Sequence, residues 1–418
     1  MGSNPTLSAN KNMKKGCLFG VQLDGDADSE IRRIMESGVF GVRFPDIDST
    51  KANLRNIWYA IFADLLTISP GDKVFFFAKR RIYGMAEVVG LGDEGTLGPI
   101  LNYRDSDIFN KTPVGGSIYL GEDAEKVKVV VLLKPSPAFF PEGIDMDEVL
   151  SYPGAEYCWG LRFWSGKNFL QLGIEETRLL EGIFLRRFAS LPRETRPKTS
   201  GYLEAQSRAE ALGIARPSIV KMLADPAHAA DVSGDKINRE FAIHGALIEA
   251  IQYGTSALPA AFLDSKDYLL GCQREVPASP PKPHEYADFM DVVRFLAWSA
   301  ERPVSIRFDI FEVKKDRMTG EALTIIKQLL EYVDFVARNY ASGDYNTIRA
   351  GFIAAKFPDD VLSKYRTALA MTGQNLDVEF HKPYVLSTHG GGTSTLIWRN
   401  LFLMTYKWNG RTVEFSAA

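Results

Sequence analysis

Residues 304–315 read VSIRFDIFEVKK, and they decide how the C-terminal half of the chain is interpreted. Apolar residues at every second position from Val304 to Ile310 predict a β-strand. Because side chains alternate along a strand, Glu312 and Lys314 leave the same face. A carboxylate beside an ammonium group on a rigid surface suits a hard cation next to a phosphate. Taken alone, this pair is more simply an exposed charged strand face, so the neighbouring segments decide its meaning.

The composition is that of an ordinary globular protein. The 418 residues are 45% hydrophobic and carry a formal net charge of −3. This length allows two or three domains with full cores, and no apolar run is long enough to span a bilayer. The charge neither indicates nor excludes nucleic-acid binding, because phosphate contacts need only a local basic face. Cys17, Cys158 and Cys272 are widely separated, which argues against a zinc site or disulfides and favours a cytoplasmic location.

The order of predicted elements indicates an α+β chain with more than one domain. Residues 15–192 are β-rich, with turn signals between short apolar runs. Residues 193–232 open with a polar, proline-containing stretch and continue as an alanine-rich segment, which predicts a linker with bridging helices. Residues 233–418 alternate helices and strands, which predicts an α/β domain with a mixed central sheet.

Two acidic residues precede the Glu-x-Lys strand on predicted elements. A helix that starts at Ser233-Gly234-Asp235 and runs to Ala250 carries Glu240 among apolar neighbours. A strand predicted over 286–293 carries Asp288, and its apolar neighbours make a charge there costly unless something binds it. A metal held by Asp288 and Glu312 would satisfy both carboxylates.

A helix predicted over 320–340 follows the Glu-x-Lys strand. Gln328 and Tyr332 are four residues apart on it, so they share a face. The simpler interpretation of these two residues is a solvated helix edge. A strand over 348–354 and a helix over 358–370 complete the predicted core of the domain.

In this order the residues resemble the PD-(D/E)xK nuclease superfamily. There, a helix with a glutamate precedes a strand with an aspartate, a strand with Glu-x-Lys and a further helix, and one branch carries Gln-x-x-x-Tyr on that last helix. The resemblance covers about the last 180 residues, the size of one domain. Ala287 stands where the superfamily name has proline. The catalytic residues that the resemblance implies are Glu240, Asp288, Glu312, Lys314, Gln328 and Tyr332.

The resemblance implies metal-assisted hydrolysis of a phosphodiester. Asp288 and Glu312 would hold Mg²⁺ or Mn²⁺, with the Val313 carbonyl as a third ligand. Lys314 would orient or deprotonate the attacking water, and Lys315 would contact a phosphate. Glu240 would hold the water shell of the metal, while Gln328 and Tyr332 would brace the site or touch DNA.

Two further acids compete for these roles. Asp291 is on the opposite face of the same predicted strand as Asp288, and Glu249 is an alternative to Glu240. The sequence leaves both choices open. The histidines fit neither a metalloprotease nor a His-x-Asn-His spacing, so each is expected to be structural. They include His244, His284, His381 and His389.

The N-terminal segment carries a hairpin signature. Pro70-Gly71-Asp72 is a turn signal, and the aromatic-rich run over 73–78 is followed by a second strand over 82–90. These residues resemble the central hairpin of the EVE domain, a relative of YTH, ASCH and PUA domains. The resemblance covers about residues 15–190 and implies a small, partly open β-barrel that binds a modified base. That base is most often an altered cytosine, turned out of the helix into an aromatic pocket.

Candidate residues of this pocket are aromatic, since a flipped base exchanges its stacking partners for aromatic side chains. For any one of them, packing in the core is the simpler interpretation. The insertion between Gly90 and Leu133 reshapes the family pattern, so the bound base does not follow from the resemblance. A basic hairpin tip, Lys79-Arg80-Arg81, is either a solvated turn or a contact to the DNA backbone. The pocket candidates are Trp159, Trp164, Phe40, Tyr157 and Phe163.

Together the two resemblances imply a modification-dependent DNA endonuclease. Its partner would be double-stranded DNA with modified bases, and cutting both strands favours a homodimer. A reader and a cutter on one chain raise the local concentration of the nuclease at the mark. The alternative is a non-cleaving sensor, in which the barrel binds modified RNA or a small ligand and the nuclease fold is degenerate. Cutting of modified DNA with Mg²⁺ separates the two hypotheses.

Overall fold

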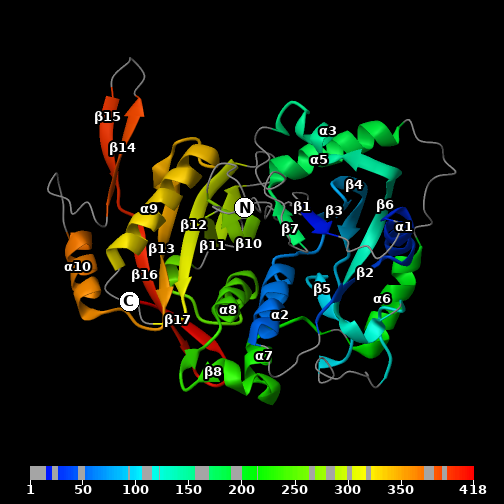
Figure 1. Cartoon of the computed structure of the whole chain (residues 1–418), viewed down its shortest axis with the longest axis horizontal. Coiled ribbons are helices and arrows are strands. Elements are labelled where there is room, and N and C mark those ends of the chain that lie inside the picture. The colour runs from blue at the N-terminus through cyan, green and yellow to red at the C-terminus, as the bar shows by residue number, and fades with distance from the viewer. Residues whose placement is uncertain are drawn as a thin grey trace, which may run out of the picture. The chain divides into compact units, whose positions relative to one another are not determined.

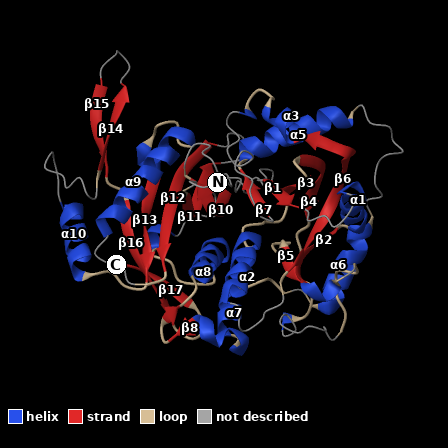
Figure 2. Cartoon of the chain, viewed as in Figure 1, coloured by secondary structure: helices blue, strands red, loops and turns tan. Residues whose placement is uncertain are grey.

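The computed structural model describes residues 16–20, 27–45, 52–92, 95–105, 115–121, 123–155, 169–189, 200–213, 215–262, 269–278, 288–298, 304–316, 322–370, 381–387 and 393–418. The chain divides between Ser218 and Ile219 into an N-terminal unit (12–218) and a C-terminal unit (219–418) (Figure 1). Each unit combines helices with its own sheet, as Figure 2 shows, so the predicted α+β class is confirmed. Among the described helices, none is both long and apolar enough to cross a membrane.

The N-terminal unit is built on a seven-stranded sheet in the order β2-β6-β4-β3-β1-β7, with β5 paired to β6. β6 spans 19 residues. Its first part pairs with β2 and β5, and its later part pairs with β4. This long strand therefore joins both groups of strands into one sheet. The strands are β1 (Gly16–Gly20), β2 (Val39–Arg43), β3 (Lys73–Ala78), β4 (Arg81–Val88), β5 (Pro99–Leu101), β6 (Val127–Asp145) and β7 (Phe169–Leu172).

The helices of this unit include one that the sequence analysis assigned to a bridge. Ala205 and Ala209 of that helix, α6, are buried with residues of β2 and β6 in one apolar cluster. The close approach requires Gly38, which has a φ of +67° and where an added Cβ would lie 2.4 Å from the Cβ of Tyr202. α6 is thus part of the N-terminal unit. The helices are α1 (Ala27–Ser37), α2 (Ala52–Leu65), α3 (Met146–Leu150), α5 (Ile174–Phe188) and α6 (Gly201–Leu212).

The predicted hairpin is formed by β3 and β4 and is confirmed. Lys73 pairs with Glu87, and Ala78 pairs with Arg81. The two residues between the strands, Lys79 and Arg80, have φ angles of 47° and 61°. This left-handed pair is the geometry of a type I′ turn, which fits the right-handed twist of the flanking strands.

The C-terminal unit is built on a six-stranded sheet in the order β10-β11-β12-β13-β16-β17. β10, β11 and β12 form an antiparallel meander, and β13 then lies parallel to β12. α9 connects those two parallel strands, as a crossover helix must. The strands are β10 (Leu269–Pro277), β11 (Phe289–Trp298), β12 (Val304–Lys314), β13 (Ile348–Ala354), β16 (Leu401–Trp408) and β17 (Val413–Ala417).

The helices of this unit correct one predicted boundary. Ser233-Gly234-Asp235 does not start a helix, because Val232–Ser233 (β8) and Lys236–Ile237 (β9) pair across it as a short hairpin. α8 begins only at Glu240. α9 packs its apolar side, with Ile326, Leu329 and Val333, against the central strands. The helices are α7 (Ile219–Ala224), α8 (Glu240–Tyr253), α9 (Ala322–Asn339) and α10 (Asp359–Ala370), and β14 (Lys382–Ser387) and β15 (Thr393–Trp398) form a separate hairpin.

Candidate functional site: an acidic cluster and an aromatic pocket

The candidate site of the C-terminal unit lies where β11 separates from β12. The ladder between these strands ends with Val292 opposite Phe311. β11 continues to pair with β10 as far as Phe289. Next to this opening, the Asp291 carboxylate accepts a hydrogen bond of 2.7 Å from the Val313 amide. A side chain thus replaces the missing backbone partner and is fixed beside the end of β12.

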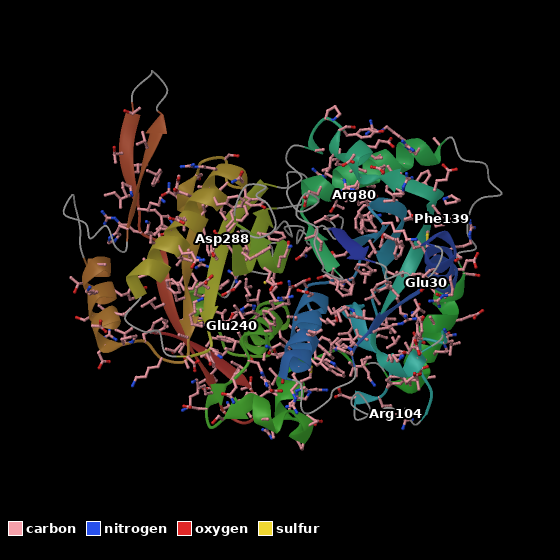
Figure 3. All side chains as sticks on the ribbon, viewed as in Figure 1. Glu30, Arg80, Arg104, Phe139, Glu240 and Asp288 are labelled. Atoms are coloured by element: carbon pink, nitrogen blue, oxygen red, sulfur yellow. The ribbon has the colours of Figure 1, made fainter. Side chains whose placement is uncertain are left out.

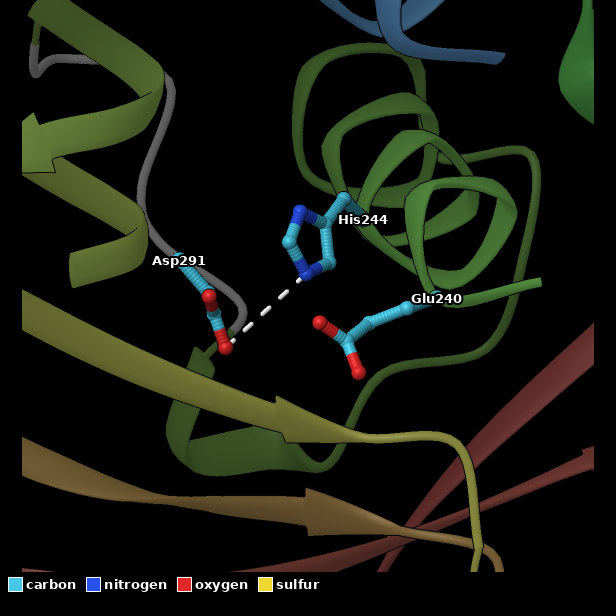
Figure 4. A group of neighbouring side chains, drawn as sticks. All are labelled: Glu240, His244 and Asp291. Atoms are coloured by element: carbon cyan, nitrogen blue, oxygen red, sulfur yellow. Dashed lines mark ion pairs between the residues drawn. The ribbon is translucent and has the colours of Figure 1, made fainter. Parts of the chain in front are cut away.

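α8 brings two more polar side chains to the same place. Glu240 and His244 are four residues apart on the helix and therefore share a face. Figure 4 shows both pointing toward Asp291, and one ligand atom of each of the three residues lies within 4.8 Å of the others. His244 Nε2 is 3.9 Å from Asp291 Oδ2. We call these three residues, together with Glu312 and Lys314, the acidic cluster.

β12 supplies the Glu-x-Lys pair of the cluster. Lys314 Nζ donates a hydrogen bond of 2.8 Å to Glu312 Oε1. The Glu312 side chain is 6% exposed and that of Lys314 is 33% exposed, so the carboxylate is enclosed while the ammonium group reaches solvent. The alternative of a freely exposed charged strand face therefore does not hold for Glu312.

The cluster perturbs the proton affinities of its members. Burial, followed by the charge of Glu312, raises the pKa of Asp291 to about 8. Burial also raises the pKa values of Glu240 and Glu312 above the ordinary glutamate range. Burial lowers the pKa of Lys314, but Glu312, Asp291 and Glu240 outweigh this, so its net pKa is raised and it stays a cation.

His244 is kept neutral by its surroundings. It is fully buried, and burial, helped by the charges of Arg274 and Lys314, holds its pKa well below 6.5. Neither ring nitrogen of His244 has a hydrogen-bond partner among the described residues, and Glu312 Oε2 is also buried without one. Unpaired buried polar atoms cost free energy, which indicates that a bound ligand pairs with these nitrogen and oxygen atoms. A neutral imidazole and several carboxylates form a donor set that fits a divalent metal.

The structure brings Asp291, rather than the predicted Asp288, into the cluster. β11 begins at Phe289, so Asp288 precedes the strand, is exposed, and contributes its carbonyl to the Ala278 amide. Figure 3 labels Asp288 and Glu240 at separate places in the C-terminal unit. The sequence predicted that this strand starts at 286, whereas β11 starts at Phe289, and Asp288 therefore precedes the strand.

Of the two candidate glutamates, Glu240 lies in the acidic cluster and Glu249 does not. Glu249 is completely buried and accepts hydrogen bonds from the amides of Ile219 and Val220, at 2.8 and 3.2 Å. It therefore caps the first turn of α7. Its burial has a structural explanation that needs no ligand.

Gln328 and Tyr332 connect α9 to the start of β11. Gln328 Nε2 donates to the Tyr332 hydroxyl at 2.5 Å, and that hydroxyl donates to the Phe289 carbonyl at 3.2 Å. Burial and the nearby charges of Glu312, Asp288 and Asp291 raise the pKa of Tyr332. The phenol thus remains protonated and holds the start of β11. Lys315 is exposed next to the cluster.

A buried network fixes the start of α8. Asp231 is fully buried, accepts a hydrogen bond of 2.8 Å from Arg239 Nε, and has an oxygen 3.0 Å from His228 Nδ1. Arg239 is the residue before Glu240. The network therefore positions the helix end that carries Glu240 and, one turn later, His244.

The N-terminal unit contains an aromatic pocket. It holds about 560 Å³ of space free of atoms, part of it open to solvent. Phe40 of β2, the described member of the predicted pocket set, is one of its walls, and Phe169 of β7 is another. The rings of Phe40 and Phe169 are 6.0 Å apart at 80°. Trp159, Trp164, Tyr157 and Phe163 lie outside the described residues.

The polar groups of this pocket were not predicted. Arg33 makes a two-fold contact to Glu30, with hydrogen bonds of 3.0 and 2.6 Å, and donates a third of 2.8 Å to the Tyr119 hydroxyl. The Arg33 guanidinium also lies 5.4 Å from the centre of the Tyr119 ring. The hydrogen bond to Glu30 raises the pKa of Arg33. These residues come from α1 and from the inserted segment after Gly90, so no local motif joins them.

The basic hairpin tip is partly neutralised. Arg80 donates a hydrogen bond of 2.6 Å to Asp147, and Arg81 lies 3.7 Å from Asp145. Lys79 is exposed and makes no ion pair with a described residue. Lys79 is therefore the better candidate of the three for a phosphate contact.

The chain was compared with protein families, curated proteins and solved structures. No protein-family model matches the chain, and neither a curated protein nor a solved structure is significantly similar to it.

Proposed function

We propose that the protein is a metal-dependent DNA endonuclease directed to modified bases. The observation that carries the proposal is the acidic cluster, in which Asp291, Glu312 and Glu240 converge with His244 beside Lys314. All three carboxylates have raised pKa values, chiefly because of burial, so their charged forms are costly without a cation, and such sites are typically functional.

The element order supports the nuclease half. α8 precedes an antiparallel meander of β10, β11 and β12, and α9 then leads to β13, parallel to β12. The glutamate, the aspartate, the Glu-x-Lys pair and the Gln-x-x-x-Tyr pair stand on successive elements of this order. This is the sequence of elements that the PD-(D/E)xK resemblance implies, with Asp291 in the aspartate role.

Each residue of the acidic cluster would have a distinct role in phosphodiester hydrolysis. Asp291, Glu312 and His244 would hold the metal, and Glu240 would hold its water shell or serve as a further ligand. When bound, a divalent metal lowers the pKa of a coordinated water and offsets charge on the phosphate. Lys314, a cation at neutral pH, would donate a hydrogen bond to the attacking water or to the scissile phosphate. This makes Lys314 an orienting group and not a base.

The imidazole of His244 bears on the choice of metal. Mg²⁺ prefers oxygen ligands, whereas imidazole nitrogen suits transition metals. A site with His244 as a ligand therefore favours Mn²⁺ over Mg²⁺ at equal concentration.

The aromatic pocket supports the reader half. A hollow lined by Phe40, Phe169 and Tyr119, with the charged pair of Glu30 and Arg33 at its wall, combines stacking surfaces with hydrogen-bonding groups. A base turned out of a duplex needs both kinds of contact. In this proposal, the pocket receives a modified base, with altered cytosine as the first choice, and the C-terminal unit cuts the DNA.

The decisive experiment compares cleavage of DNA containing modified cytosines with cleavage of plain DNA, in Mg²⁺ and in Mn²⁺. Lys314→Ala should lower cleavage at least about 10³-fold and leave DNA binding intact, because it removes charge at the reacting centre. Lys407→Ala is the control, because Lys407 is an exposed lysine of the same unit that is not part of the acidic cluster.

Two outcomes would contradict the proposal. Cleavage that persists in the Lys314→Ala variant would show that the cluster is not the active site. Binding of modified nucleic acid with no cleavage under either metal would favour the alternative, a non-cleaving sensor.

A further inference from the structure

An exposed leucine stands beside the aromatic pocket. Leu120 is 71% exposed, the highest value among the large hydrophobic residues recorded as exposed in the described part of the chain. Its neighbour in sequence, Tyr119, is only 5% exposed and lines the pocket. Two consecutive residues thus differ sharply, because Tyr119 lines the pocket while Leu120 faces solvent.

The segment that precedes Leu120 is held in place by several hydrogen bonds. The Tyr119 amide donates a hydrogen bond of 2.8 Å to the side-chain oxygen of the fully buried Asn102. Ser117 Oγ donates to the Tyr119 carbonyl at 2.6 Å, and Arg208 Nε donates to the Ile118 carbonyl at 3.2 Å. The backbone on the N-terminal side of Leu120 is therefore fixed.

The Tyr119 ring also restricts the residue after Leu120. A Cβ added at Gly121 would lie 2.4 Å from the Tyr119 hydroxyl, so the ring lies directly against Gly121. The ring is also held at its edge, where a Cβ added at Gly41 of β2 would lie 2.8 Å from it. Leu120 thus lies between two residues that are fixed by the pocket, Tyr119, which lines it, and Gly121, which packs against the Tyr119 ring.

An exposed apolar side chain next to a residue that lines such a pocket has a use in base recognition. Turning a base out of a duplex leaves a gap in the stack, and proteins commonly fill gaps between base steps with an apolar side chain. We propose that Leu120 is the wedge that enters the duplex and occupies the place of the base bound in the pocket. This inference rests on the proposed function of the N-terminal unit as a reader of modified bases in duplex DNA.

The experiment measures DNA binding by the full-length chain without divalent metal, so that nothing is cut. The probes are a fluorescent duplex with one 5-methylcytosine or 5-hydroxymethylcytosine, the unmodified duplex, and the marked strand alone. Leu120→Ala should weaken binding to the marked duplex about tenfold, because the gap in the stack is left empty. Binding to the single strand should not change, since it has no duplex stack to fill.

Three variants make the result specific. Leu120→Phe should restore duplex binding, because a larger apolar group also fills the gap. Leu185→Ala, which removes another exposed leucine (51%) of the same unit that does not line the pocket, should bind all probes like the original protein. Equal melting temperatures of all variants would show that folding is unaffected.

The outcomes separate this inference from the proposed function. Equal binding of marked and plain duplexes by the original protein would overturn the reader function. A retained preference for the mark with unchanged duplex binding by Leu120→Ala would overturn the wedge alone. Equal weakening on duplex and single strand would also overturn the wedge, because Leu120 would then contact the strand itself.

Discussion

The acidic cluster of the C-terminal unit and the aromatic pocket of the N-terminal unit differ in whether their polar groups have hydrogen-bond partners. In the cluster, Glu312 Oε2 and the nitrogens of His244 are buried without partners. In the pocket, both oxygens of Glu30 and the guanidinium of Arg33 are already paired. Buried atoms without partners fit the proposal that the cluster binds an ion, and the paired groups fit the proposal that the pocket recognises its ligand largely by shape and stacking.

The largest expected effect is on the cleavage rate, when Asp291 of the acidic cluster is replaced. Asp291→Asn should lower cleavage of DNA at least about 10³-fold, because it removes a carboxylate ligand from the metal site. Asp288→Asn, three residues earlier on an exposed position, should leave the rate within about twofold. Both rates are measured on the same DNA with Mn²⁺. The reverse order of effects would return the metal site to Asp288.

The next effect tests the imidazole. His244→Ala should weaken Mn²⁺ binding about tenfold or more, with a smaller loss for Mg²⁺, since the removed ligand is a nitrogen. Titration of each metal, followed by the rise in melting temperature, measures both affinities on the folded protein. Equal losses for the two metals would mean that His244 acts only through packing.

The pH dependence of stability gives a third, smaller effect. The pKa of Asp291 is about 8 in the folded chain and ordinarily 3.8. The folded state therefore binds this proton more tightly than the unfolded state, and metal-free stability falls as pH rises from the ordinary pKa toward 8. Asp291→Asn should remove this loss and raise the melting temperature at pH 8 by roughly 2–4 °C or more, and by less at pH 5.

The chelator-treated protein is the sample for that measurement, and Asp288→Asn is its control. The control should follow the original protein at every pH. A variant that is equally stable at pH 5 and pH 8 relative to the original chain would contradict the raised pKa of Asp291.

The smallest effect is a change in melting temperature when Arg33 of the aromatic pocket is replaced. Its sign is opposite to that of Asp291→Asn. Arg33→Gln should lower the melting temperature by roughly 1–3 °C, because the partly exposed pair with Glu30 and the hydrogen bond to Tyr119 are lost. Added Mn²⁺ should not alter this difference. Removing a charge would thus stabilise one region and destabilise the other, and a stabilised Arg33→Gln protein would erase the contrast between them.

The sequence predicted most of the elements correctly, because their apolar periods are strong. The hairpin of β3 and β4, the strand β13 and the helix α9 follow directly from these patterns. The start of α8 was misplaced, since Ser233-Gly234-Asp235 serves equally well as a helix start or as a turn between two short strands. Local composition does not separate these possibilities.

The site was less accessible from the sequence than the fold. The choice between Asp288 and Asp291 depends on where β11 leaves β12, and that is a property of the sheet and not of either residue. His244 was expected to be structural, although its spacing from Glu240 was a usable signal. Glu30, Arg33 and Tyr119 meet only through tertiary folding, so nothing in their local sequences joins them.

The hydrogen bond between the Val313 amide and the Asp291 carboxylate affects how fast that amide exchanges its hydrogen with solvent. Protection of that amide against hydrogen exchange depends on a side chain, not on a neighbouring strand. Any event that draws the Asp291 carboxylate away, such as protonation or a ligand, changes the exchange rate of this amide while the Ile310 and Phe311 amides of the paired part of β12 keep theirs. The exchange rate of the Val313 amide therefore reports whether the cluster is occupied without the need for a substrate.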